Sequence, residues 1–462
     1  MIPNRFEPVI HTLEPIAARF TERGFRLYLV GGIIRDLLLG TVDDFTDVDL
    51  TTDAEPDEIR SALAGLVHSV NRAGERFGTI ACSLQDLRLE ITTHRAEAYV
   101  DTSRKPHVTF STSLQDDLAR RDFTINAMAL ELTAQEPRLI DPYHGLDDLL
   151  AHRLRTPVSP ATSFSEDPLR MLRAARFIAR FDLVPEPELI ATIEQLAPRL
   201  DILSRERIRD ELNRLLTIPN PTPGLQFLVN TPLASNFLPA LANLRLEQDP
   251  VHHHKDVLAH TIAVVQKCSP RLRLRLAALL HDIAKPKTRE IGPDGVTFHF
   301  HDVVGARMAT AIMTELRYPK ELTQEVAKLV ALHLRFHGYE NGWTDSAVRR
   351  YIRDAGELYD DLNELTVCDA TTRNQHKLQA MTRRMEEFKQ RVVHLQESEA
   401  LASLRPPLDG LAIMDLLQIP PSPTVGKAIA FLLETELEEG PLPRDQAIER
   451  LLAWWRRQSH DA

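Results

Sequence analysis

The stretch FRLYLVGGIIRDLLLGTVDDFTDVDL, residues 25–50, decides the fold of the N-terminal part of the chain. Its apolar start, residues 25–30, predicts a buried strand, Gly31 and Gly32 predict a tight turn, and residues 33–40 predict a helix closed by a glycine. Glycines let backbone amides approach an anion, and the N-terminus of a helix favours negative charge. Strand, glycine pair and helix together therefore predict a cradle for phosphate.

Two aspartates, Asp47 and Asp49, follow this helix at the start of another apolar alternation. In a β-strand the side chains alternate between faces, so residues at i and i+2 project to the same side. Two carboxylates on one side can bind a hard divalent cation together. An isolated pair of this kind is most often part of a loop or a helix cap, and its position after the glycine cradle is what favours a metal site.

The composition of the 462-residue chain, with 43% hydrophobic residues, is typical of a soluble globular protein. Its length has room for about three domains. Cys82, Cys268 and Cys368 are far apart and odd in number, which argues against disulfides and a cysteine-based zinc site and favours a reducing compartment. Because we find neither a membrane-length apolar run nor a signal peptide, we expect a cytoplasmic protein without membrane association.

The net charge of −11 argues mildly against a polyanionic partner, because nucleic-acid affinity depends on lysines and arginines that neutralise phosphates. The arginines are nevertheless clustered, and those in residues 170–180 and 349–353 have helical spacing that can give one basic face each. Solvated helix faces with local ion pairs explain such clusters equally well. Net charge therefore does not decide the partner.

The chain changes character near residue 155. Before it, strands are predicted at 77–82 and 87–93 in addition to the strand-turn-helix unit. After it, no strand run of comparable strength follows, and helices separated by prolines are predicted instead. The expected fold class is α+β, with a mixed N-terminal part and an all-α remainder.

Residues 120–129, RRDFTINAMA, join two cations, a carboxylate and an amide to an apolar stretch. On a helix, Asp122 and Asn126 would share a face at i and i+4, which suits hydrogen bonds to a sugar hydroxyl. Capping of a buried helix by Asp122 is the alternative.

Residues 166–170, EDPLR, predict a helix that starts at the proline. Asp167 and Arg170 would then share a face at i and i+3, and Glu166 would pair with Arg170. A carboxylate acceptor beside a guanidinium donor can read the edge of C or A. An ordinary ion pair in the first helical turn is the alternative.

These motifs, in this order, resemble those of the class II tRNA nucleotidyltransferases, the CCA-adding enzymes and their poly(A) polymerase relatives. The resemblance rests on Gly31-Gly32, Arg35-Asp36, Asp47-x-Asp49, Arg120-Arg121-Asp122, Glu166-Asp167-x-x-Arg170, Ser204-Arg205-Glu206-Arg207 and Glu211-Leu212. It covers residues 20–240 most strongly. It implies a polymerase β-like head, followed by helical neck, body and tail regions that hold the tRNA acceptor arm.

The resemblance also implies a role for each residue of the motifs. Asp47 and Asp49 would bind two magnesium ions, and Glu90 is a candidate third carboxylate or else a solvent-facing strand residue. The implied nucleotide contacts are Gly31, Gly32 and Arg35 to phosphates, Asp122 to the ribose, and Asp167 with Arg170 to the base. By their spacing, Asn126 would join Asp122 at the ribose, and Arg173 and Arg176 on the same helical face would add base or phosphate contacts.

The segment 95–110 is similar to the mobile loop that this family links to the switch from C to A. It contains Tyr99, Asp101, Arg104, Lys105 and Pro106. Its presence favours the addition of A, and a charged surface loop is the alternative.

A second metal-binding pattern lies in the C-terminal half. His260, the pair His281-Asp282 after an apolar run, and Asp369 have the order of an HD-type site, because imidazole and carboxylate together suit a divalent metal. Further histidines that can complete a second metal site or bind phosphate are His299, His301, His333 and His337, while the three histidines at 252–254 are typical of a solvated turn.

This region resembles the HD phosphohydrolase domain attached to some bacterial members of the family, and the order of its motifs is most similar to the actinobacterial branch. A structural His-Asp pair, or a domain that mainly positions tRNA, are the alternatives. The expected domains are the nucleotidyltransferase head at 1–155, the neck and body at 156–245, the HD domain at 246–395 and a helical tail at 396–462.

We therefore expect an enzyme that adds CCA to the tRNA acceptor end from CTP and ATP. It would use Mg²⁺ in the head and a divalent metal of unspecified identity in the HD domain. The alternatives are a poly(A) polymerase or A-adding enzyme, an HD phosphohydrolase with a nucleotide-binding head, and a structural RNA-binding protein. The sequence leaves the oligomeric state open.

Overall fold

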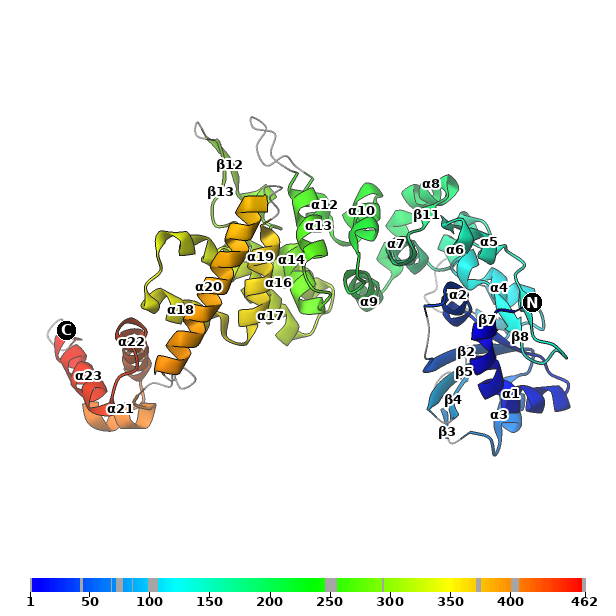
Figure 1. Ribbon diagram of the computed structural model, residues 1–462, viewed down its shortest axis with the longest axis horizontal. Helices are drawn as coiled ribbons and strands as arrows, with labels where there is room; N and C mark the ends of the chain where they lie inside the picture. The colour runs from blue at the N-terminus through cyan, green and yellow to red at the C-terminus, as the bar shows by residue number, and fades with distance from the viewer. Residues whose placement is uncertain are drawn as a thin grey trace. The chain divides into compact units, whose positions relative to one another are not determined.

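The computed structural model describes residues 2–41, 45–67, 69–71, 78–84, 86–98, 107–245, 256–292, 295–370, 375–399 and 407–458. Its contacts divide the chain into two compact units (Figure 1). The first comprises Met1–Asn243 with Glu315–Tyr318, and the second comprises Leu244–Thr314 with Pro319–Ala462. No helix in the described part of the chain has the length and apolar character needed to span a membrane. The four expected domains stay a prediction.

A seven-stranded mixed sheet forms the centre of the first unit, in the order β3-β4-β5-β2-β1-β8-β9. The strands are β1 (Leu27–Val30), β2 (Asp47–Thr52), β3 (Ser69–Asn71), β4 (Thr79–Leu84), β5 (Leu87–Thr93), β8 (Ala129–Glu131) and β9 (Arg138–Ile140). Strands β2 and β5 run parallel, and the other neighbours in the sheet run antiparallel.

The sheet buries one face against helices α1 (Glu7–Glu22) and α3 (Pro56–Leu63). Val48 and Leu50 of β2 belong to this core. Because side chains alternate along a strand, Asp47 and Asp49 lie on the opposite face. The predicted strand-turn-helix unit is confirmed: β1 leads into α2 (Gly32–Leu39), which ends at Gly40 in the left-handed conformation.

Short helices and strand pairs complete the first unit. They are η1 (Asn4–Phe6), α4 (Leu114–Ala119), η3 (Thr124–Asn126), α5 (Gly145–Leu150), α6 (Pro160–Glu166), α7 (Leu169–Phe181), α8 (Pro187–Leu196), η4 (Ala197–Ile202), α9 (Arg205–Leu216), α10 (Thr222–Asn230), α11 (Leu233–Phe237), α12 (Pro239–Ala242), and the pairs β6 (Arg95–Ala98) with β7 (His107–Phe110) and β10 (Arg153–Leu154) with β11 (Val184–Pro185). Helix α7 packs against both α9 and α10. Gly224 permits the second contact, since a Cβ there would lie 2.4 Å from the carbonyl oxygen of Ala175.

The second unit is mainly helical. Its elements are α13 (Val257–Lys267), α14 (Leu272–Leu280), α15 (Lys285–Thr288), β12 (Arg289–Gly292), β13 (Gly295–Phe298), α16 (His301–Glu315), α17 (Lys320–Leu332), η5 (Arg335–Asn341), α18 (Asp345–Ala355), η6 (Gly356–Leu358), α19 (Tyr359–Asp369), α20 (Gln375–Glu399), α21 (Gly410–Leu417), α22 (Pro423–Glu439) and α23 (Arg444–Gln458). Helix α14 packs against α13, α17 and α19, and its residues from Leu274 onward are buried. The residues directly after α14 therefore start from the centre of this unit.

Two predictions about secondary structure are wrong. Strands do occur after residue 155: β11 is a short parallel partner of β10, and β12 and β13 form an antiparallel hairpin. The stretch 120–129 forms no α-helix, because a single turn of 3-10 helix, η3, leads directly into β8. Asp122 lies before that turn and caps no α-helix either.

Candidate active site and metal centre

Three carboxylates meet on the open face of the sheet in the first unit. The register of the parallel pair β2 and β5 sets Asp49 directly opposite Glu90, and Asp47 one pleat further along. All three side chains are exposed on that face. Partial desolvation raises the pKa of Asp49, Glu90 and Asp47 raise it further, and Arg121 opposes them. This concentration of negative charge attracts a cation.

A cavity of about 450 Å³ lies beside these carboxylates. Ten residues predicted to bind nucleotide or metal line it: Gly31, Gly32, Arg35, Asp49, Asp122, Asn126, Asp167, Arg170, Arg173 and Arg176. Five further residues line the cavity without a role predicted from the sequence: Arg121, Leu169, Phe177, Arg207 and Arg214. Arg121 and Arg207 belong to motifs that carried the resemblance, which was the available signal for them. The lining residues come from β2, from α2, η3, α7 and α9, and from the segments that connect them.

The glycine pair shapes one wall of the cavity. Gly31 has φ +84°, where side chains other than glycine are strained. A Cβ at Gly31 would lie 3.3 Å from both Arg121 Nη1 and Asp49 Oδ2, and a Cβ at Gly32 would lie 3.1 Å from Arg35 Nη2. Glycine at these positions therefore keeps the space beside Asp49 open.

Arg35 is held on several sides. Its Nε donates to Asp36 Oδ1 at 2.8 Å, its Nη1 donates to Asn126 Oδ1, and its guanidinium lies 4.2 Å from the ring centre of Phe181. The side chain is buried, and desolvation lowers its pKa despite Asp36. These contacts tie α2 to α7.

Asp122 accepts hydrogen bonds at both carboxylate oxygens. Oδ1 accepts from the backbone of Phe123 and from Asn126 Nδ2, and Oδ2 accepts from Arg173 Nε at 2.8 Å. Burial tends to raise the pKa of Asp122, but Arg173 and the hydrogen bonds outweigh burial and lower it. Asp122 and Asn126 thus do interact, through a turn rather than along the predicted helix.

Asp167 and Arg170 do not share one helix face as predicted. Asp167 is the residue after α6 and is extended, whereas Arg170 lies in the first turn of α7. Asp167 instead pairs with Arg207 at 2.8 Å. Arg170 is buried and donates to Ser163, Glu166 and the carbonyl oxygen of Arg120, so only its predicted pairing with Glu166 is confirmed.

Glu211 of α9 is a buried carboxylate shared by three arginines. Arg176 Nε lies 2.8 Å from Oε2, and Arg214 Nη1 and Arg173 Nη1 lie 3.0 and 3.9 Å from Oε1. The lining of the cavity contains seven arginines and three aspartates. The cavity therefore carries surplus positive charge, which suits a polyphosphate.

The remaining prediction for the first unit concerns the loop within residues 95–110. Tyr99, Asp101, Arg104, Lys105 and Pro106 lie outside the described residues.

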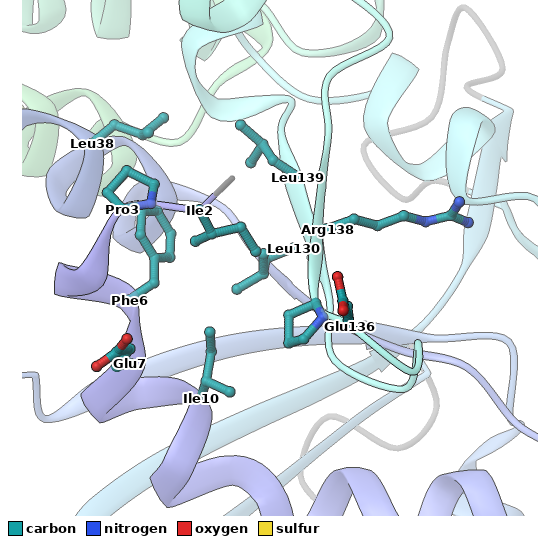
Figure 2. Close-up of a pocket in the computed structure, with 11 residues that line it drawn as sticks. Ile2, Pro3, Phe6, Glu7, Ile10, Leu38, Leu130, Glu136, Arg138 and Leu139 are labelled. Atoms are coloured by element: carbon teal, nitrogen blue, oxygen red, sulfur yellow. The ribbon is translucent and has the colours of Figure 1, made fainter.

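A larger cavity of about 700 Å³ in this unit is mostly apolar and is lined by residues such as Phe6, Ile10 and Leu139 (Figure 2). Its charged lining residues are Glu7, Glu136 and Arg138, so it lacks the set of arginines found beside Asp49.

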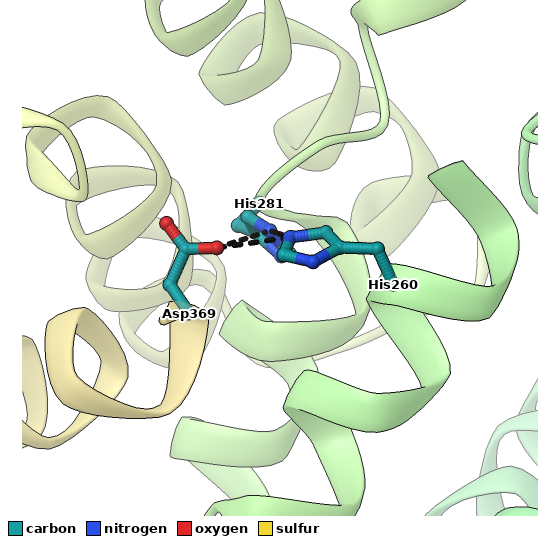
Figure 3. A group of neighbouring side chains, drawn as sticks. All are labelled: His260, His281 and Asp369. Atoms are coloured by element: carbon teal, nitrogen blue, oxygen red, sulfur yellow. Dashed lines mark hydrogen bonds and ion pairs between the residues drawn. The ribbon is translucent and has the colours of Figure 1, made fainter. Parts of the chain in front are cut away.

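The second unit contains a separate group of possible metal ligands. His260 of α13, His281 after α14 and Asp369 at the end of α19 converge, as Figure 3 shows. Asp369 Oδ1 lies 2.9 Å from His260 Nε2 and 3.5 Å from His281 Nε2. We call these three residues the first triad. Ligand atoms at such distances can share one metal ion.

Asp282 adjoins the first triad and begins a second group. Its Oδ2 lies 3.2 Å from His281 Nε2, and its Oδ1 lies 3.5 Å from His301 Nε2. Asp282, His301 and His333 form a further set of possible ligands, which we call the second triad. His299 and His337 are exposed and belong to neither triad, and residues 252–254 lie outside the described part.

The charges of the two triads are strongly coupled. Burial opposes a charged imidazole, but Asp282 and Asp369 raise the pKa of His281 to about 10. Burial also opposes the charged carboxyls, but His281 holds the pKa of Asp282, and with His260 that of Asp369, below the usual range. Burial and His281 lower the pKa of His333 to about 4. A positive charge is therefore favourable at His281, whereas a second one at His333 is not.

Three family models match successive parts of the chain. They are a poly A polymerase head domain at residues 27–155, a probable RNA and SrmB-binding site of polymerase A at 182–244, and an HD domain at 257–374. The first model covers the sheet with its carboxylates, and the third covers both triads.

Two curated relatives illustrate the similarity. The CCA-adding enzyme of Limosilactobacillus reuteri is 38% identical over 243 residues, which are 52% of this chain and 57% of that protein. The A-adding tRNA nucleotidyltransferase of Deinococcus radiodurans is 31% identical over 420 residues, 88% of this chain and 90% of that protein. The match thus spans little more than half of the L. reuteri enzyme but nearly all of the D. radiodurans enzyme.

Solved structures agree on the fold. The CCA-adding enzyme of Bacillus stearothermophilus in complex with CTP has a TM-score of 0.70 at 21% identity and covers 100% of both chains. The CCA-adding enzyme of Thermotoga maritima in complex with tRNA has a TM-score of 0.59 at 18% identity and covers 97% of this chain and 96% of that one.

Sheet, carboxylates and arginine-lined cavity define a nucleotidyltransferase head, and an HD domain is joined to it. The extended match to the D. radiodurans enzyme makes the relationship more specific. The chain belongs to the family of tRNA nucleotidyltransferases and poly(A) polymerases.

Proposed function

We propose that this protein adds the 3′-terminal CCA to tRNA from CTP and ATP, without a nucleic-acid template. The observation that carries the proposal is the set Asp47, Asp49 and Glu90 on one sheet face beside an arginine-lined cavity. Relatives named CCA-adding enzymes support the choice of substrate. Because the tRNA acceptor end is the proposed substrate, we also propose that the protein acts in the cytoplasm.

The three carboxylates fit magnesium, because hard oxygen ligands on one face suit a hard cation. Bound there, two Mg²⁺ ions would activate the 3′-hydroxyl and neutralise charge on the triphosphate. Asp47 and Asp49 would hold them, with Glu90 as third ligand. Gly31 and Gly32 would let backbone amides approach the phosphates.

Different residues of the cavity would bind different parts of the nucleotide. Arg173 and Arg176 both pair with Glu211 and line the cavity. There they would bind the phosphates or the base of the nucleotide. Asp122 with Asn126 would face the ribose. Their mutual hydrogen bond fixes their positions before the nucleotide arrives.

We assign selection of the base to Asp167 and the arginines near it. Its carboxylate can accept from the exocyclic amine of C or A, and a neighbouring guanidinium can donate to the ring acceptors. Arg207 is paired with Asp167, and Arg170 anchors the same segment through Ser163 and Glu166. We propose that Asp167 reads the base with Arg207 and that Arg170 keeps Asp167 in place.

The proposal is tested with tRNA transcripts that end before CCA or after CC, incubated with CTP, ATP or both. We expect CMP addition to the first, AMP addition to the second, and a full CCA end with both nucleotides. Asp47→Ala should abolish incorporation, while Asp57→Ala, an exposed carboxylate of α3, should not. No incorporation, or long A tracts, would contradict the proposal.

A second candidate is an A-adding enzyme, because the relative that matches over 90% of its length bears that name. The same assay separates the two: an A-adding enzyme extends only the transcript that already ends in CC. For the HD domain we propose a divalent metal at the first triad. Loss of bound metal from His260→Ala in the full chain, with His299→Ala unchanged, would support it.

A further inference from the structure

We propose that Phe177 is a positioning residue of the cavity beside Asp49. Its ring holds three guanidinium groups by cation–π contacts without neutralising them, so that their charge stays available for a triphosphate. These groups belong to Arg35, Arg173 and Arg176, which also line the cavity. The inference rests on the proposed function, and it assigns a role to a lining residue for which the sequence predicted none.

Phe177 is buried in the wall of the cavity, and its ring is held by two other rings. Of the described residues that line the cavity, it alone is aromatic, and it is 2% exposed. The ring of Phe123 meets it at an angle of 76°, with the ring centres 5.4 Å apart. The ring of Phe181, one turn later in α7, stacks on it at 5.8 Å. Both arrangements are favourable for aromatic pairs, and together they fix the plane of the Phe177 ring.

Three arginines from two helices lie around this fixed ring. The guanidinium carbon lies 4.5 Å from the ring centre in Arg176, and 5.5 Å from it in both Arg35 and Arg173. All three are within the distance of about 6 Å at which the negative face of a ring attracts a cation. Arg173 and Arg176 are close to Phe177 because they share α7 with it, but Arg35 comes from α2. The contact of Arg35 therefore depends on the tertiary fold and not on helical spacing.

Phe181 extends this arrangement by one helical turn. The guanidinium carbon of Arg35 lies 4.2 Å from the ring centre of Phe181, and that of Arg180 lies 5.0 Å from it. Arg35 is therefore shared between the two stacked rings. Its position is fixed by both of them before a nucleotide binds, which lowers the entropic cost of binding.

An aromatic ring supplies a kind of stabilisation that the nearby carboxylates do not. A carboxylate cancels the charge of the guanidinium group that it pairs with, whereas a ring face attracts that group and leaves its charge in place. Burial lowers the pKa of Arg176, because Glu211 does not fully offset desolvation and Arg173 lowers it further. Burial also lowers the pKa of Arg35, although Asp36 is paired with it. Both arginines thus gain from an attraction that adds no negative charge to the cavity.

The test changes the electron density of the ring and leaves its shape nearly intact. In the full chain, Phe177 is replaced by phenylalanine with one, two or three fluorines on the ring, each of which withdraws electrons from the ring face. Calorimetry at one fixed Mg²⁺ concentration measures the binding of inorganic triphosphate, a probe without base or sugar. We expect the dissociation constant to rise with each fluorine, to about tenfold with three, because the cation–π attraction weakens. Phe177→Leu, which removes the ring, should weaken binding at least as much.

The matched control is the same fluorine series at Phe20 of α1. This ring is fully buried in the core against the sheet, and no cation lies over it in the described part of the chain. We expect its series to leave the affinity for triphosphate unchanged. The ring with one fluorine guards against misfolding, since it is almost the size of the native ring.

Equal affinities across the Phe177 series would overturn the proposal and leave the ring a packing role alone. A parent protein that binds no triphosphate would overturn it as well. A parent that binds triphosphate but adds neither CMP nor AMP to tRNA would contradict the proposed function instead, and the fluorine series would still decide the role of Phe177.

Discussion

Glu90 is placed in the site by the pairing of its strand with the strand of Asp49, and the residues next to it in the sequence do not indicate this position. The sequence left it between a metal ligand and a solvent-facing strand residue. The parallel register sets it opposite Asp49 and on the same face, and its charge raises the pKa of Asp49. Strand pairing of this kind depends on a residue 41 positions away and cannot be predicted from the local pattern.

We expect Glu90→Gln to lower the rate of nucleotide incorporation by about 100-fold, the usual effect of removing one electrostatic partner of a transition state. The Mg²⁺ concentration needed for half-maximal rate should rise, because one hard ligand is lost. Initial rates across a Mg²⁺ titration measure both effects. The control is Asp86→Asn, an exposed carboxylate just before β5. Unchanged rates at limiting Mg²⁺ would remove Glu90 from the site.

Asp122 makes stability depend on pH in a defined direction. Its folded-state pKa is lowered, so its ion pair with Arg173 stabilises the protein fully above the unfolded value of about 3.9 and loses this effect as the pH falls through the folded value. Asp122→Asn should therefore cost about 3 kcal/mol at neutral pH, and the difference from the parent should shrink in acid.

The measurement must report on the first unit. All three tryptophans, Trp343, Trp454 and Trp455, lie in the second unit, so their fluorescence would miss the change. Hydrogen exchange of the α7 amides, followed from neutral pH to below the unfolded pKa of about 3.9, reports it directly. A difference that stays constant with pH would contradict the assigned ion pair, and Asp57→Asn serves as the exposed control.

The turn between β1 and α2 is where local sequence was most informative. A glycine pair between an apolar strand and a helix has few other conformations, and Gly31 has the positive φ that such a turn needs. The hairpin of β12 and β13 shows the opposite case. Its strands are four residues long, and β12, Arg-Glu-Ile-Gly, is largely exposed. The sequence there has no alternation of apolar and polar residues that would predict a strand.

Substitution of this turn should damage the site more than the fold. Gly31→Ala meets a positive φ and two polar atoms of the site at 3.3 Å, and we expect a loss of about 1–3 kcal/mol together with most of the activity. Gly65→Ala is the matched control, since it has a similar φ of +79° with nothing within 4 Å. Equal activity losses in the two variants would contradict a role for Gly31 in the cavity.

The sequence did not predict that arginines of α9 line the cavity, and the reason is related. Arg207 and Arg214 are 40 or more residues from the Asp122 and Asp167 motifs, and nothing in their helical spacing points to a cavity. The buried Glu211 between them on the same helix was part of a recognised motif, but its partners were not predictable. Packing of α7 against α9 supplies that information.

The two compact units contain separate candidate sites. Each candidate site is built wholly from residues of one unit, the carboxylates and cavity in the first and both triads in the second. The order of motifs along the chain predicted this separation. It could not predict that His301 and His333 join Asp282 while His299 and His337 do not, because that choice depends on how α16 and α17 pack.

We expect the two centres to fail independently. Asp47→Ala should abolish nucleotide incorporation but leave metal binding at the first triad unchanged. Asp369→Ala should abolish metal binding at the first triad but leave incorporation unchanged. Paired measurements of incorporation and bound Co²⁺ on both variants decide this. Incorporation that survives Asp47→Ala but disappears in Asp369→Ala would move the catalytic centre to the HD domain.

The sharing of Glu211 among Arg173, Arg176 and Arg214 has a consequence for the lifetime of the protein. Asp122 also pairs with Arg173, yet two carboxylates do not balance three guanidinium groups, so like-charge repulsion remains within the folded state. A triphosphate relieves it, and at 100 times its dissociation constant a ligand adds about 2.7 kcal/mol to stability. Nucleotide supply would then set how often α7 and α9 open to proteases, so that CTP and ATP, the proposed substrates, would also preserve the protein.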